Sequence, residues 1–165
     1  MRLLILAVLI TTTALTTTAQ KGNDSKIKFN VGAELGFANG AFGNTHSFAI
    51  GATAQIEYQV NEKTRATANS GIIQYSGKSI DATTKFSGIT AIPVLVGAKY
   101  YFSDNFYGAA QLGLTIFSGA LVGTSKFTYS PGLGFMINDK IDATLKYTGF
   151  SNLGGAFGVR VAYNL

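Results

Sequence analysis

Hydrophobic and polar positions alternate along most of the chain with a period of two residues. Over residues 27–37 every odd position is apolar and every even position is small or polar. The same alternation recurs over residues 48–60, 92–102, 110–116, 127–137, 141–147 and 157–165. Because a β-strand sends alternate side chains to opposite faces, each segment is predicted to be a strand with one apolar face. A weaker segment, residues 65–75, completes eight strands, but its two faces cannot be ranked.

The connections between these segments alternate in length. Residues 61–64, 103–105 and 138–140 are short and polar, which is typical of tight turns. Residues 38–47, 76–87, 118–125 and 149–155 are longer and rich in Gly, Ser, Asn and Thr. Short turns at one rim and longer loops at the other predict an all-β fold, an eight-stranded antiparallel up-and-down barrel. Pro93 and Pro131 fall inside strands, where proline removes a ladder donor, so we expect bulges or local widening there.

The first residues have the layout of a secretory signal peptide. Arg2 precedes a short apolar core at residues 3–10, and Thr17 and Ala19 place small residues at the −3 and −1 positions of a cleavage site. The apolar core is too short for a membrane helix, which needs about 20 residues. The sequence therefore predicts a signal peptide at residues 1–19 and one barrel domain at residues 20–165.

The amino-acid composition limits the kinds of functional site that this chain can form. The chain is 47% hydrophobic and only 13% charged, about half the roughly 25% charged residues that are usual in soluble domains. It has no Cys and one His, which excludes a disulfide scaffold, a thiolate zinc site and a cysteine nucleophile. No metal or cofactor is expected. The cations are scattered, so the net charge of +5 does not indicate a nucleic-acid partner.

The apolar faces carry aromatic residues toward both ends of the strands. They form two predicted girdles: Phe37, Phe48, Phe127 and Phe157 near the long-loop rim, and Tyr58, Tyr100, Phe102, Phe135 and Tyr163 near the short-turn rim. Aromatic girdles around an aliphatic band are typical of a barrel that crosses a bilayer. The small and polar faces would then fill a narrow lumen. A soluble, exported barrel that binds a ligand in an apolar interior remains the alternative.

Two segments carry a resemblance to a known family. These are Ile92–Phe102, which is followed by a short turn, and the terminal strand that ends at residues 161–165. With them the chain resembles the small outer-membrane β-barrels of Gram-negative bacteria, of the OmpA/OmpX type, including the PorT-like outer-membrane β-barrel domain. The resemblance implies a monomer in the outer membrane of a Gram-negative bacterium, with the short turns toward the periplasm. The resemblance does not carry a function. The role that we expect is non-enzymatic: structural, adhesive or that of a narrow pore.

The same resemblance implies a partner during biogenesis. The alternating apolar residues Val161, Tyr163 and Leu165 are similar to the terminal signal that the barrel-assembly machinery reads. An aromatic residue is commoner than Leu165 at the last position.

Seven charged residues have the parity of the inward faces: Lys28, Glu34, Glu57, Lys99, Asp142, Lys146 and Arg160. A charge in a narrow lumen costs several kcal/mol unless it is paired. Symmetric pairing of the first hairpin would place Lys28 near Glu57, and Glu34 within reach of Arg160 or Lys146. This charge network would either plug the lumen or act as a salt-bridge gate for small ions.

An enzymatic alternative rests on His46 and Ser47, in the first long connection. Some outer-membrane barrels modify lipid A with His and Ser near the outer rim, but no carboxylate lies close to this pair in sequence. Separately, Lys78, Lys85 and Lys126 lie in or beside the long loops. There they could contact outer-membrane lipid and anionic lipopolysaccharide.

Overall fold

The computed structural model describes residues 26–79, 85–119 and 123–165. The predicted signal peptide, residues 1–19, lies outside the described residues and stays a prediction.

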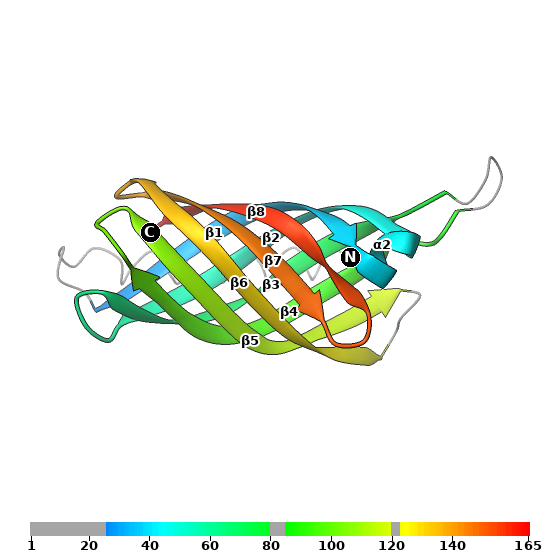
Figure 1. Ribbon diagram of the computed structural model, residues 1–165, viewed down its shortest axis with the longest axis horizontal. Helices are drawn as coiled ribbons and strands as arrows, with labels where there is room; N and C mark the ends of the chain where they lie inside the picture. Colours follow the sequence, from blue (N-terminus) through cyan, green and yellow to red (C-terminus); the bar gives the residue numbers. More distant parts are fainter. Residues whose placement is uncertain (1–25, 80–84, 120–122) are drawn as a thin grey trace, which may run out of the picture.

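Eight antiparallel strands follow one another around a closed barrel, and the last strand pairs with the first (Figure 1). The elements are β1 (Ile27–Asn39), α2 (Gly40–Thr45), β2 (His46–Gln59), β3 (Thr64–Gly77), β4 (Ile89–Tyr101), β5 (Phe106–Gly119), β6 (Thr124–Asn138), β7 (Ile141–Phe150) and β8 (Gly154–Asn164). The up-and-down topology predicted from the alternating connections is confirmed.

The short turns are closed by their own side chains. Asn61 Oδ1 accepts hydrogen bonds from the backbone N–H groups of Lys63 and Thr64. Asn138 Oδ1 does the same for Lys140 and Ile141. Such Asx contacts satisfy turn N–H groups locally, which explains why these three-to-four-residue polar segments end strands cleanly.

The long-loop rim differs from the prediction. The connection expected at residues 38–47 is largely structured: β1 runs to Asn39, β2 begins at His46, and the short helix α2 lies between them. Gly154 has φ +96°, and a Cβ there would lie 2.8 Å from the Asn39 carbonyl oxygen. A glycine at this position lets α2 approach the start of β8 closely. The described parts of the β3–β4 connection, residues 78–79 and 85–88, extend beyond α2 at this rim (Figure 1).

The structure distinguishes the two faces of the strand at residues 65–75, which the sequence could not rank. The odd positions of β3 point inward, including Thr67, Asn69, Ile73 and Tyr75, and the even positions point outward.

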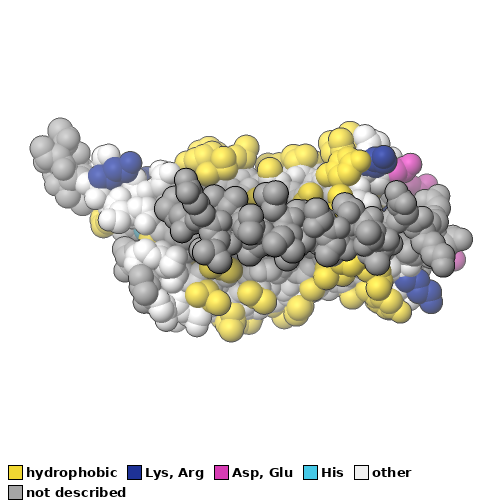
Figure 2. Space-filling model, turned by 180° about the vertical axis from the view of Figure 1, so that it is seen from behind, with side chains coloured by type: hydrophobic (Ala, Val, Ile, Leu, Met, Phe, Trp, Pro, Cys, Tyr) yellow, Lys and Arg dark blue, Asp and Glu magenta, His cyan; other side chains and the backbone are white. Residues whose placement is uncertain are grey.

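The outer surface of the barrel is apolar. Most outward side chains are aliphatic or aromatic, and the nine girdle residues are all on this surface with 37 to 66% of their area exposed. Figure 2 shows hydrophobic side chains along the middle of the barrel and charged side chains at its two ends. No described helix is long and apolar enough to cross a membrane. An apolar band of this kind fits hydrocarbon and not water, so the soluble alternative is not supported.

Of the two expected adjustments at the prolines, bulges or local widening, the structure shows a local opening of the ladder and no bulge. The β3–β4 ladder lacks the two pairs around Pro93, and the β6–β7 ladder lacks the two pairs around Pro131. In both ladders the register is the same on either side of the gap. Proline thus opens the ladder locally, and the register shifts lie elsewhere, at His46/Ala49 and Met136/Asn138.

Candidate functional site

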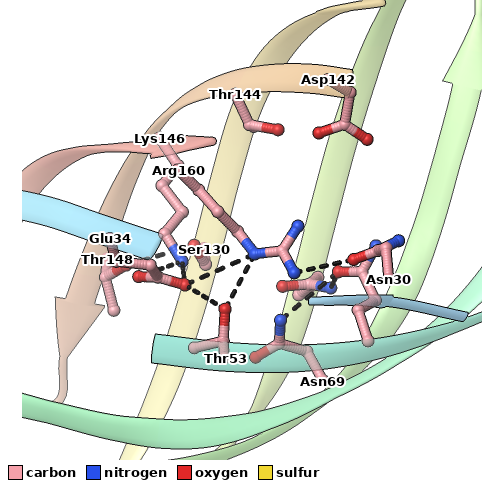
Figure 3. A network of polar contacts seen from close by, with 12 residues as sticks. Asn30, Glu34, Thr53, Asn69, Ser130, Asp142, Thr144, Lys146, Thr148 and Arg160 are labelled. Carbon is pink, nitrogen blue, oxygen red and sulfur yellow. Dashed lines mark hydrogen bonds and ion pairs between the residues drawn. The ribbon is translucent and has the colours of Figure 1, made fainter. Parts of the chain in front are cut away.

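The barrel interior holds most of the chemically active side chains, in layers along its axis. At mid-height Glu34 of β1 lies between two cations (Figure 3). Lys146 Nζ of β7 is 2.8 Å from the Glu34 carboxylate, and Arg160 Nε of β8 is 3.8 Å from Glu34 Oε1. Thr53 of β2 joins them, since its hydroxyl donates to Glu34 and accepts from Arg160 Nε. Arg160 Nη2 also donates to Asn30 Oδ1, at 2.7 Å.

A second layer lies nearer the short turns and is centred on Lys99 of β4. Its Nζ is 2.6 Å from Glu57 Oε1 and 3.2 Å from Asp142 Oδ2, and 4.4 Å from the centre of the Tyr107 ring. Glu57 Oε1 also accepts from the side-chain amides of Asn30 and Gln55 at 2.9 Å. The Lys99, Glu57 and Asp142 side chains are all buried.

Neutral side chains connect the layers across the lumen. Gln111 Nε2 donates to Gln55 Oε1 and to Thr67 Oγ1, at 3.0 and 3.1 Å. Tyr107 Oη and Thr144 Oγ1 are 2.7 Å apart. Such bridges satisfy buried polar groups that would otherwise each cost about 1–3 kcal/mol. Sequence reasoning missed these amides and hydroxyls because it followed charges only, although their inward parity was available.

The seven predicted lumen charges are placed unequally. Six of them are paired: Glu34, Glu57, Asp142, Lys99, Lys146 and Arg160. All six are buried except Lys146, which is partly buried. Three carboxylates face three cations, so the paired network is neutral. Lys28 is opposite Glu57 in the β1–β2 register, as symmetric pairing of the hairpin required, but the ionic partner of Glu57 is Lys99. Lys28 itself is only half-buried.

The end of the lumen nearest the long loops is apolar. Phe42 of α2 is fully buried there and contacts three inward rings, with centroids 4.9 Å away for Tyr75, 6.2 Å for Phe117 and 5.5 Å for Phe150. This aromatic plug contradicts the expectation that the inward faces hold only small, polar and charged residues. It forms because α2 folds its one large apolar side chain into the barrel mouth and out of water.

His46 is part of this plug and does not lie in a solvated loop. Its ring stacks on Phe42 at 4.8 Å, its Nδ1 is 2.8 Å from Thr45 Oγ1, and its buried Nε2 has no partner among the described residues. The Ser47 hydroxyl donates to the Ser76 carbonyl at 3.4 Å. Within the described residues no carboxylate orients the imidazole, and nothing brings Ser47 to it. The pair therefore lacks the geometry of a catalytic triad.

Little empty space remains in the layered part of the lumen. Two cavities of about 20 Å³ lie beside the networks, one lined by Gln55, Lys99 and Arg160 and the other by Glu34, Tyr75 and Lys146. A cavity of that size holds about one water molecule. In the described part of the chain, no group of three or more His, Asp or Glu residues could hold a metal ion.

The predicted assembly signal lies on the closing strand. Val161 and Tyr163 point outward from β8, and the backbone N–H of Leu165 donates to the Phe29 carbonyl at 2.8 Å. The last residue is thus tied to β1 at the seam of the barrel.

Several solved structures share this architecture. Ail of Yersinia pestis superimposes with a TM-score of 0.58 at 12% identity, over 84% of this chain and 99% of Ail. Neisserial surface protein A gives 0.54 at 15% identity, over 86% and 98%, and OprG of Pseudomonas aeruginosa gives 0.55 at 12%, over 87% and 98%. At these identities the likeness concerns the fold alone.

Comparison with curated proteins finds no significant match. A family model described as the outer membrane protein beta-barrel domain, in contrast, matches residues 4–164. This match covers nearly the whole sequence and agrees with the closed eight-stranded barrel, its apolar outer band and its charged lumen. The chain belongs to the outer membrane protein beta-barrel domain family.

Proposed function

We propose that this protein is a plugged, non-conducting and non-enzymatic barrel of the Gram-negative outer membrane, which acts through its outer rim in adhesion or in contact with lipopolysaccharide. The short turns would face the periplasm and the long loops the cell exterior. The observation that carries the proposal is the filled lumen. Phe42 and its neighbours close the long-loop end, and the neutral ion-pair network fills the middle.

The buried contacts inside the lumen oppose the passage of an ion. An ion crossing this lumen would have to displace buried pairs such as Lys99–Glu57, at 2.6 Å, and then pass a cluster of aromatic rings. Separating one partner of a buried pair costs about 3–5 kcal/mol. The two cavities of about 20 Å³ beside the network offer no continuous path.

The charges of the long-loop rim, which would be the outer rim in the membrane, favour an anionic partner. Lys78, Lys85 and Lys126 lie at or near this rim, and the described residues there include no Asp or Glu; Asp81 lies in the same connection as Lys78 and Lys85. Lys78 is partly engaged, since its Nζ donates to the Gly43 carbonyl at 2.6 Å. Cations at this level would interact with the phosphates of lipopolysaccharide.

Single-channel recording tests the plugged lumen. Protein that shows the folded, heat-modifiable form on a gel is inserted into planar bilayers in KCl, next to an open porin as positive control. The wild type is expected to produce no discrete conductance steps. Reproducible steps from folded protein would overturn the closed-lumen part of the proposal.

Binding to lipopolysaccharide tests the rim. The double variant Lys85→Gln/Lys126→Gln is compared with Lys63→Gln/Lys140→Gln, which removes the same charge from the short-turn rim. The first variant is expected to bind lipopolysaccharide vesicles more weakly than wild type, and the second to bind them equally well. Equal binding by all three would refute the contact, and release of fatty acid from lipopolysaccharide by purified protein would refute the non-enzymatic role.

A further inference from the structure

The barrel is hollow at its short-turn end, below the Lys99 layer. A cavity of about 590 Å³ opens there, which is within the range of sites for small molecules. Its inner wall is formed by Lys28 on β1, Arg65 on β3, Tyr101 on β4 and Met136 on β6. We call this cavity the vestibule. It is distinct from the plugged part of the lumen and contains none of the paired network residues.

Three cations line the vestibule: Lys63 at an exposed turn of its mouth, and Lys28 and Arg65 on its inner wall. The two on the inner wall lack ionic partners. In the described part of the chain, neither Lys28 nor Arg65 has a carboxylate oxygen within 4 Å. Arg65 Nη1 is buried and has no hydrogen-bond partner there, while its guanidinium carbon lies 5.7 Å from the centre of the Tyr101 ring. A buried charged donor without an acceptor costs more than the 1–3 kcal/mol of a neutral one. An incoming anion would recover this cost.

No nearby carboxylate of the described residues forms an ion pair with Lys28 or Arg65. Glu57 is opposite Lys28 in register, but its Oε1 already accepts from Lys99, Asn30 and Gln55. Three further carboxylates line the mouth of the vestibule at exposed turn positions: Glu62, Asp104 and Asp139. There they are hydrated and screened by salt. Since the buried network is already neutral, the positive charge of Lys28 and Arg65 is in excess inside the barrel.

We propose that the vestibule is a binding site for a carboxylate or phosphate group carried by a small, partly apolar molecule. Arg65 would bind the anion with its planar guanidinium, which suits both groups in a bidentate manner, and Lys28 would add the second cation. Tyr101 and Met136 would contact the apolar body of the ligand. Binding itself needs only the fold. The access of periplasmic ligands rests on the orientation given under the proposed function.

Three probes test the site on the mature chain in detergent micelles. Inorganic phosphate and benzoate represent the two anions, and benzamide is the neutral counterpart of benzoate. The backbone amide signals of Arg65 and Tyr101 are followed by NMR at constant ionic strength. We expect saturable shifts with phosphate, benzoate or both, and none with benzamide. Whichever anion binds more tightly identifies the group that the site prefers.

Matched variants localise the binding. Arg65→Gln and Lys28→Gln are each expected to weaken it by about tenfold, the effect of losing one charge-assisted hydrogen bond. Lys140→Gln removes the same charge from an exposed turn at the same rim that does not line the vestibule. It is expected to change the affinity less than twofold. Heat-modifiability confirms that each variant is folded, and Lys28→Gln carries the test alone if Arg65→Gln does not fold.

Two results would overturn the site. One is the absence of saturable shifts with both anions, and the other is an equal loss of binding in Arg65→Gln and Lys140→Gln, which would indicate only diffuse attraction to the rim. Neither result concerns conductance, so the plugged lumen would stand. A conducting wild type would, conversely, leave the vestibule result unchanged.

Discussion

Lys99→Met should destabilise the barrel strongly, because Lys99 serves two buried carboxylates at once. Its Nζ is 2.6 Å from Glu57 Oε1 and 3.2 Å from Asp142 Oδ2, and both acidic side chains are almost inaccessible. Methionine keeps most of the length of the side chain and removes its charge and its hydrogen-bond donors. Breaking a buried pair by removing one partner costs about 3–5 kcal/mol, so the free energy of unfolding should fall by about that amount.

The structure also predicts which second substitution restores stability. Without Lys99, Glu57 keeps two amide donors, Asn30 and Gln55. Asp142 loses more, because Oδ1 has no partner among the described residues and Oδ2 accepts from Lys99. Lys99→Met/Asp142→Asn should therefore recover more stability than Lys99→Met/Glu57→Gln. The ranking depends only on which carboxylate is left without donors.

Urea titration of the protein in lipid vesicles measures these differences, with the heat-modifiable gel shift reporting the folded fraction. Lys140→Met, at an exposed turn, is the control and should change the free energy of unfolding by less than about 0.5 kcal/mol. A Lys99→Met variant as stable as this control would refute the ion-pair reasoning. Equal recovery by both double variants would refute the assignment of Asp142 as the more dependent carboxylate.

Three further predictions concern packing and assembly. Phe42→Ala removes the fully buried centre of the aromatic plug and should cost about 3–5 kcal/mol in urea titration, whereas Phe86→Ala, on the exposed β3–β4 connection, should cost less than about 1 kcal/mol; equal costs would argue against the plug. Gly134→Ala would place a Cβ against the Tyr107 ring, so it should lower the free energy of unfolding by about 1–3 kcal/mol. In a Tyr107→Ala background the clash is absent, so Gly134→Ala/Tyr107→Ala should be as stable as Tyr107→Ala alone. Leu165→Phe should raise the fraction of heat-modifiable protein in outer-membrane preparations if an aromatic end strengthens the assembly signal, and an unchanged fraction would show that Leu165 is already read efficiently.

Alternation predicted the strands well because parity is a local property. Each segment with period two became a strand, and the apolar face pointed outward in every one of them. Symmetric pairing also gave the register of the first hairpin, in which Lys28 is opposite Glu57.

The aromatic plug was missed because its members lie outside the alternating segments. Phe117 and Phe150 follow the predicted strands 110–116 and 141–147, Tyr75 ends the strand whose faces could not be ranked, and Phe42 lies in a predicted loop. The sequence of α2, Gly-Ala-Phe-Gly-Asn-Thr, has low helix propensity. Its helix is stabilised by burial of Phe42, which is a tertiary effect that local patterns do not carry.

Ion pairs between strands that are not neighbours are harder to predict from the sequence than the strands themselves. Lys99 and Glu57 are 42 residues apart, and Lys146 and Glu34 are 112 apart. Neither pair joins neighbouring strands: Lys99 is on β4 and Glu57 on β2, while Lys146 is on β7 and Glu34 on β1. Such contacts depend on the stagger of all eight strands, which accumulates around the barrel. Charge type and inward parity were readable from the sequence, as were Lys146 and Arg160 as partners of Glu34. The pairing of Glu57 with Lys99 was not.

These cross-barrel pairs bear on how the fold selects its register. A slip of one residue between two strands is excluded by alternation alone, because it would turn charged side chains into the lipid. A slip of two residues keeps every side chain on its face and is not excluded in that way. It would, however, move Lys99 or Glu34 by about 7 Å along the axis relative to its partners and leave buried charges unpaired. The lumen network therefore discriminates between registers that the hydrophobic pattern treats as equal. The paired network is neutral and largely enclosed, while Lys28 and Arg65, which have no ion pair, lie beyond it where a cavity opens to solvent.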